Sequence, residues 1–145
     1  MNSQRGYFNR ILKLIYKKSP LQKKRLEKYL TGRDSLFFQK AEDFSAKYLG
    51  YLQKEDTPIE YAVDAYLKMC NDMMKSQVFF MKTGRYPESL AKDVFSNVYI
   101  NEREMKSYMI GLAISQFLWA THYDIYCFLK IILKTMKGIF LRILK

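Results

Sequence analysis

Residues that break helices are scarce in this chain, and this scarcity constrains its fold more than any other feature of the sequence. Of 145 residues, only six are Gly and three are Pro. Both residues interrupt helices, because Pro lacks a backbone N–H and Gly costs conformational entropy. The long segments between them are rich in Leu, Lys, Ile, Tyr and Met. The sequence therefore predicts an all-α fold.

The apolar residues of the first half recur with the period of amphipathic helices, and capping signals separate these helices. After the segment 7–18, Ser19 and Pro20 supply an N-cap and a first helical residue, and Asp34 is a candidate N-cap for the helix after that. The stretch "TPIE" at Thr57–Glu60 has the form of a capping box. We therefore expect helices over residues 7–18, 20–30, 35–53 and 58–82.

The second half holds the longest helical run of the sequence. It follows a loop, "GRYPES", and a shorter helix predicted around Leu90–Tyr99. "NERE" at Asn101–Glu104 offers a second capping box, and the run that it opens continues to about Lys137. We therefore expect a compact all-α bundle of about six or seven helices, with one long helix near the C-terminus that is buried on two sides.

Seventeen consecutive residues of this long run, from Ser107 to Tyr123, carry no formal charge when the histidine is neutral. A membrane-spanning helix needs about 20 consecutive apolar residues. This stretch is shorter and includes Ser115, Gln116 and His122. We therefore expect a buried helix of a globular domain rather than a membrane span.

At 100° per residue, this helix has two different sides. One side is apolar, and we expect it to pack; it consists of Ile110, Ile114, Phe117, Leu118, Thr121, Ile125 and Phe128. Polar and aromatic residues, with Gly111 among them, gather on or beside the opposite side. The candidates there for lining a subunit interface or a substrate site are Tyr108, Ser115, Gln116, Trp119, His122, Tyr123 and Tyr126.

Two interpretations of this second side remain open. A buried histidine is commonly a satisfied structural group, and a stripe of Trp and Tyr is commonly core or interface. Alternatively, His122 exchanges a proton near neutral pH, and Trp119 with Tyr108 stacks on a planar ligand.

No known catalytic or metal-binding motif accompanies these residues. The sequence lacks a Walker loop, a nucleophile elbow and an HExxH motif. It has one histidine, and Cys70 and Cys127 lie in apolar helical patterns without a CxxC partner, so we expect both to be small buried residues. We therefore assign no catalytic residue, no cofactor-binding residue and no metal ligand in this chain.

Positive charge is concentrated at the two ends of the sequence. Residues 1–33 hold ten Lys and Arg against one acid, residues 34–129 hold ten against thirteen, and residues 130–145 hold five against none. We expect one domain, 1–145, composed over these ranges of a basic helical arm, a helical core and a basic amphipathic tail. The start of the chain lacks the pattern of a signal peptide, which favours a cytoplasmic location.

The basic tail predicts a partner of opposite charge. Its Lys and Arg lie largely apart from its apolar residues on a helix wheel, as in helices that rest on an anionic membrane surface. Phe8, Ile11 and Lys13 of the first helix are then a possible second contact. The alternatives are that both ends are solvated helices packed on the domain, or that the basic segment Lys17–Lys28 binds nucleic acid, although no recognisable binding module is present.

The second half also resembles a known family. The pieces that carry the resemblance are "KTGRY" at Lys82–Tyr86, "VY" at Val98–Tyr99, "YMIGLAISQFLW" at Tyr108–Trp119 and "HY" at His122–Tyr123. Over roughly residues 58–133, the order of polar and aromatic residues is similar to the helical N-terminal region of bacterial class I S-adenosylmethionine-dependent methyltransferases.

The resemblance implies a helical region that roofs the acceptor-substrate pocket or forms a subunit interface. In that family a following Rossmann-like domain holds S-adenosylmethionine at a glycine-rich turn. This sequence continues instead with "KIILKTMKGIFLRILK", which has one glycine, whereas such a turn needs several for close backbone approach. The resemblance therefore implies a fragment or shortened relative that is not catalytic alone, and S-adenosylmethionine only for a full-length relative.

The sequence thus leaves two functions to be compared. The first is the helical substrate roof or dimerisation region of a methyltransferase-like protein, which self-associates or joins a missing catalytic domain. The alternative is a basic helical protein that binds an anionic membrane surface or a protein partner.

Overall fold

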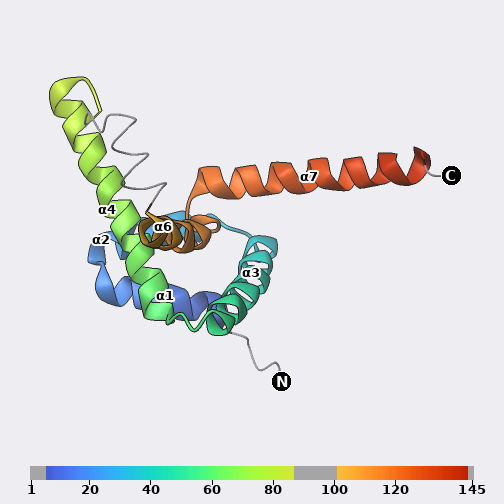
Figure 1. Cartoon of the computed structure of the whole chain (residues 1–145), viewed down its shortest axis with the longest axis horizontal. Coiled ribbons are helices and arrows are strands. Elements are labelled where there is room, and N and C mark those ends of the chain that lie inside the picture. The colour runs from blue at the N-terminus through green and yellow to red at the C-terminus, as the bar shows by residue number, and fades with distance from the viewer. Residues whose placement is uncertain (1–5, 87–100, 144–145) are drawn as a thin grey trace. The chain divides into compact units, whose positions relative to one another are not determined.

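All regular elements in the described part of the chain are α-helices, which confirms the predicted all-α class (Figure 1). The computed structural model describes residues 6–86 and 101–143, and side chains as far as residue 136. The helices are α1 Tyr7–Lys18, α2 Pro20–Thr31, α3 Ser35–Lys54, α4 Ile59–Thr83, α6 Glu102–Ser115 and α7 Ala120–Ile143. The helix predicted around Leu90–Tyr99 lies outside the described residues. The chain's contacts divide it into two compact units, residues 1–114 and 115–145.

The predicted capping residues begin two helices of the first unit. Ser19 Oγ accepts a hydrogen bond of 3.3 Å from the N–H of Gln22, and Pro20 is the first residue of α2. Asp34 Oδ1 accepts one of 2.8 Å from the N–H of Phe37 at the start of α3. These side chains satisfy backbone donors that have no partner within their own helix.

Two other helices begin in ways that the sequence pattern did not indicate. The carboxylate of Glu42, on α3, accepts hydrogen bonds of 2.9 Å from the N–H groups of Tyr7 and Phe8, so the start of α1 is capped by another helix. The predicted capping box at the start of α4 is wrong. Its N-cap is Pro58 without a side-chain hydrogen bond, because the hydroxyl of Thr57 donates to the carbonyl two residues earlier at 3.1 Å.

The core of the first unit forms around α1, which packs against α2, α3 and α4. Phe8 of α1 meets Phe37 of α3 edge to face, with 6.4 Å between the ring centroids. Phe8 and Ile11 are only 6% and 3% exposed, so they cannot form the second membrane contact that the sequence suggested. Of the three residues proposed for that contact, Lys13 alone is exposed.

Helix α6 lies against α4 at a contact between the two backbones. A Cβ atom at Gly111 would stand 2.7 Å from the carbonyl carbon of Ala65 and 2.8 Å from the backbone nitrogen of Tyr66. Nearby, the buried hydroxyl of Tyr48 on α3 donates a hydrogen bond of 2.8 Å to the carbonyl of Ile110. Gly111 therefore serves helix packing, although the helix wheel placed it on the polar side.

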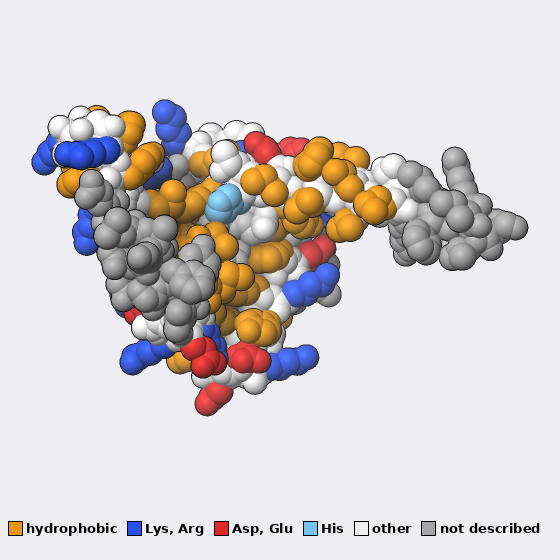
Figure 2. Space-filling model, turned by 45° about the horizontal axis from the view of Figure 1, so that its top comes forward, with side chains coloured by type: hydrophobic (Ala, Val, Ile, Leu, Met, Phe, Trp, Pro, Cys, Tyr) orange, Lys and Arg blue, Asp and Glu red, His pale blue; other side chains and the backbone are white. Residues whose placement is uncertain are grey.

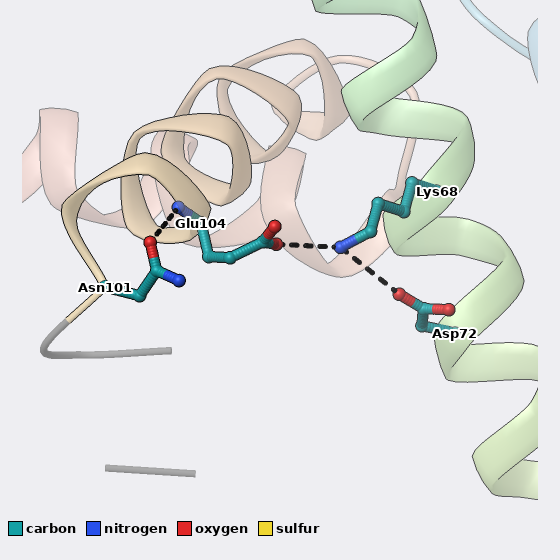
Figure 3. Close-up of polar contacts among 4 residues, drawn as sticks. All are labelled: Lys68, Asp72, Asn101 and Glu104. Atoms are coloured by element: carbon teal, nitrogen blue, oxygen red, sulfur yellow. Dashed lines mark hydrogen bonds and ion pairs between the residues drawn. The ribbon is translucent and has the colours of Figure 1, made fainter. Parts of the chain in front are cut away.

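An ion-pair network also joins α4 and α6 (Figure 3). Lys68 Nζ lies 3.0 Å from Glu104 Oε2 and 4.0 Å from Asp72 Oδ2, and the hydrogen bond to Glu104 raises the pKa of Lys68. Asn101 Oδ1 accepts a hydrogen bond of 3.2 Å from the N–H of Glu104, which confirms the predicted N-cap. Because these charged groups are exposed, the network positions the start of α6 and adds little stability.

Substitution of Gly111 by Ala should lower the free energy of unfolding, although alanine is the better helix former by about 1 kcal/mol. The added methyl group would clash with the backbone of α4, which cannot move aside as a flexible side chain can. Overpacking of this kind costs about 1–3 kcal/mol. Urea unfolding followed by circular dichroism measures the change.

Gly50→Ala in α3 is the matched control, because nothing lies within 4 Å of a Cβ atom at that position. We expect this variant to gain roughly 0.5–1 kcal/mol. The two substitutions therefore have opposite expected signs. A Gly111→Ala variant as stable as Gly50→Ala would show that α4 and α6 do not meet at this glycine.

Candidate functional site

The long helix predicted near the C-terminus is in fact two helices. α6 ends at Ser115 and α7 begins at Ala120, so the prediction of one continuous helix over residues 101–137 is wrong. The carbonyl of Ser115 accepts hydrogen bonds of 3.0 Å from the N–H groups of both Leu118 and Trp119. A tight turn therefore separates the two helices, and a single helix wheel does not apply across it.

Side-chain hydrogen bonds hold this turn. Ser115 Oγ and His122 Nδ1 are 2.7 Å apart, and Gln116 Nε2 donates a hydrogen bond of 2.7 Å to the carbonyl of His122. In a straight helix, two residues seven positions apart would be separated by about 10 Å along the axis. The turn brings them into contact because polar side chains that bond locally compete with the helical ladder. We call residues Ser115–Tyr126 the corner.

Aromatic rings surround these hydrogen bonds. The ring centroids of Trp119 and His122 are 4.8 Å apart. Phe117 contacts the rings of Tyr123 and Tyr126, with centroid distances of 5.5 and 5.4 Å. The helix wheel places Phe117 on the packing side, so the sequence did not predict it as a member of this cluster. Only the position of the helix break, which the apolar period does not reveal, would have indicated it.

The structure brings six of the seven predicted lining residues together in the corner. They are Ser115, Gln116, Trp119, His122, Tyr123 and Tyr126. Tyr108 instead lies in the first unit, is 45% exposed, and lines a hollow of about 130 Å³ together with Lys68 and Glu104. The prediction that Tyr108 and Trp119 share one helix face is therefore wrong, because the helix ends between them.

The hydrogen-bonded residues of the corner have a structural role and not a catalytic one. A Ser–His pair at hydrogen-bond distance is also the core of nucleophilic catalysis, but such a serine must reach its substrate. Ser115 is fully buried, at 0% exposure. Burial also lowers the pKa of His122, which keeps the imidazole neutral near pH 7. The pair therefore helps to hold the turn that follows α6.

The single histidine gives the corner a measurable pH dependence. Burial lowers the pKa of His122 below its ordinary value of 6.5, so in the unfolded chain the imidazole takes up its proton at higher pH than in the folded chain. Stability is therefore lost as the pH falls from about 6.5 through the folded pKa. Proton NMR of the only imidazole should show a titration midpoint below 6.5.

The His122→Gln variant is the control for this pH dependence. The natural chain should lose free energy of unfolding over this acid range because His122 takes up a proton. The variant lacks the imidazole and should not show that loss. A titration midpoint at or above 6.5 in the natural chain would contradict the half-buried, neutral imidazole at the corner.

Beyond the corner, one side of α7 is apolar and exposed (Figure 2). We call this side the apolar arc; it covers about 140° of the helix at the standard period. Its members are between 36% and 66% exposed, and they are Ile125, Phe128, Leu129, Ile132, Leu133 and Met136. Such a continuous apolar surface in contact with water is typical of an interaction site.

The lysines of α7 lie outside the arc. Lys134 falls nearly opposite its centre on the helix wheel, and Lys130 lies over the ring of Tyr126, with Nζ 5.6 Å from the ring centroid. The expected packing of Ile125 and Phe128 is wrong, because these residues are 55% and 60% exposed. The reason is again the break, since these side chains follow the register of α7 and not that of α6.

Within residues 6–86 and 101–143, no three His, Cys, Asp or Glu side chains gather closely enough to hold a metal ion. Nor does any helix there combine the length and the apolar character that are needed to cross a bilayer.

Neither a protein-family model, nor a curated protein, nor a solved structure matches this chain. The resemblance to the N-terminal region of methyltransferases therefore stays a prediction, as does the S-adenosylmethionine that it implies for a full-length relative. The corner and the apolar arc are the features from which a function can be argued.

Proposed function

We propose that the protein binds the surface of an anionic membrane through α7. The observation that carries this proposal is the apolar arc, in which six large side chains on one side of a helix are exposed to water. A helix of this kind lies in the plane of the membrane interface, with its apolar side among the upper acyl chains and its polar side toward the headgroups.

The charge of α7 supports a membrane surface over a protein partner. Residues 130–145 hold five Lys and Arg and no acid, and the whole chain has a formal net charge of +11. Each cation near an anionic leaflet contributes about 1 kcal/mol of attraction. Lys130 and Lys134 lie within the length of the arc but outside its apolar side, as surface binding requires. A bilayer also accepts any arrangement of apolar side chains, whereas a protein groove must match their shape.

Replacement of Phe128 and Leu133 by Glu should weaken binding to vesicles that contain phosphatidylglycerol by at least about tenfold. Full burial of either side chain is worth about 1.5–3 kcal/mol, and tenfold corresponds to 1.4 kcal/mol. The only tryptophan, Trp119, precedes α7 by one residue, so its emission reports binding. Vesicle flotation gives the bound fraction independently.

The matched control carries Val78→Glu and Met81→Glu, which remove two exposed apolar residues of α4 and add the same charge. We expect this variant to bind more strongly than the α7 variant at every salt concentration. Equal losses of vesicle binding in both variants would show that the added negative charge, and not the loss of the apolar arc, weakens binding. Unchanged binding by the α7 variant would exclude the arc as the membrane contact.

The corner supports a second candidate, the predicted dimerisation or substrate-roof role. Six residues that the sequence analysis selected for lining an interface or a substrate do gather there, with the rings of Trp119 and Tyr126 half-buried. If the corner is a dimer contact, Trp119→Ala with Tyr126→Ala should shift sedimentation from dimer to monomer. A natural chain that sediments as a monomer at high concentration would remove this candidate.

A further inference from the structure

The first unit presents two stripes of cations on helices whose apolar sides are already buried. On α1 the stripe consists of Arg10, Lys13 and Lys17, which lie within about 60° of one another and opposite the buried side. On α2 it consists of Lys24, Arg25 and Lys28, which lie within about 100°. We call these six residues the basic stripes; all of them are exposed.

Two acids near the stripes, Asp64 and Glu27, are paired with other lysines. Lys18 forms an ion pair with Asp64 at 2.5 Å, and Lys23 lies 3.9 Å from Glu27 on the same helix. No ion pair within residues 6–86 and 101–136 involves a member of the stripes. One acid, Glu60, lines the same hollow of about 330 Å³ as Arg10 and Lys13. The stripes therefore keep most of their charge for an external anion.

The stripes attract a partner mainly through charge. The apolar sides of α1 and α2 that face the core are buried, on α2 through Leu26 and Leu30, and the large apolar side chains left exposed are Tyr7 and Leu21, at 40% and 49%. The one aromatic residue of α2, Tyr29, is half-buried with the guanidinium of Arg33 over its ring at 4.2 Å. Proteins that bind single-stranded nucleic acid stack bases on exposed aromatic rings, and α2 offers none. This arrangement fits a layer of phosphate headgroups better than nucleic acid.

We infer that the basic stripes of α1 and α2 form a second membrane contact, mainly electrostatic, with the phosphate headgroups of anionic lipids. The inference rests on the proposed function for the identity of the partner, but its residues are different from those of α7. Stable attachment of a protein to a membrane usually takes two signals, such as one apolar insertion and one polybasic surface. In this chain the apolar arc supplies the first and the stripes supply the second.

Three variants test the stripes on the full chain. One carries Arg10, Lys13 and Lys17 replaced by Gln, and a second carries Lys24, Arg25 and Lys28 replaced by Gln. The control has the same loss of charge on α3 and α4, through Lys47, Lys54 and Lys75 replaced by Gln, all of which are exposed. Circular dichroism checks that each variant is folded. The probe is a vesicle of phosphatidylcholine with phosphatidylglycerol, in low and in high salt.

We expect each stripe variant to lose on the order of 100-fold in affinity at low salt, since one cation is worth about fivefold. The control should lose much less, and high salt should remove the difference. If either stripe variant binds vesicles as the control does, the inference is wrong. If a stripe variant binds vesicles as the control does but has lost binding to a single-stranded oligonucleotide, the inference is also wrong, and the stripe binds nucleic acid instead.

The same vesicles separate this inference from the proposed function. Loss of binding in the α7 variant with Phe128→Glu and Leu133→Glu, but not in the stripe variants, would overturn the inference alone. Loss in the stripe variants, but not in the α7 variant, would overturn the proposed function alone. A natural chain that binds no vesicles would overturn both.

Discussion

The hydrogen bonds of the corner decide where α6 ends and α7 begins, and the surface of the second unit depends on that break. Ser115 Oγ and Gln116 Nε2 both bond to His122 at 2.7 Å. These bonds replace the continuing ladder of one long helix. Because the register of α7 starts anew at Ala120, Ile125 and Phe128 are exposed, while Ile110 and Ile114 of α6 are buried. The apolar arc is therefore a consequence of a polar turn.

Helices α1 and α2 differ from α7 in how much of their apolar side is exposed. In the first unit the core-facing apolar sides of α1 and α2 are buried, and their exposed sides carry positive charge. Gly111 lets α6 reach the backbone of α4. In the second unit, α7 keeps its large aliphatic side chains exposed. One chain can therefore offer two chemically different contacts to the same kind of surface, one by apolar insertion and one by charge. Neither contact alone is expected to hold the protein firmly.

Much of the first unit could be predicted from the sequence, because its signals are local. Ser19 with Pro20, and Asp34, mark helix starts through hydrogen bonds to residues three positions away. The starts of α1 and α4 could not be predicted in the same way. Glu42 caps α1 from another helix, and the turn before α4 redirects the hydroxyl of Thr57. Contacts of this kind depend on the tertiary arrangement.

The sequence predicted most of the residues of the candidate site but not their arrangement in space. Six of the seven residues do gather, because residues three, four or seven positions apart lie on the same side of a helix. The turn brings Ser115 and His122 closer together than a helix would. Tyr108 was misplaced because the helix wheel assumes an unbroken helix. Residues 112–126 contain neither Gly nor Pro, so no standard helix breaker marked the turn. Side-chain hydrogen bonds supplied the break instead.

The depth of α7 in a bilayer distinguishes a helix whose apolar arc is inserted from one that binds by charge alone. In a Trp119→Phe background, a tryptophan placed by Phe128→Trp lies in the apolar arc, and one placed by Lys134→Trp lies on the opposite side of the helix. Lipids with brominated acyl chains quench only tryptophan that is buried among those chains. We expect strong quenching for the position in the arc and weak quenching for the position outside it. Equal quenching at both positions, or none at Phe128→Trp in bound protein, would contradict it.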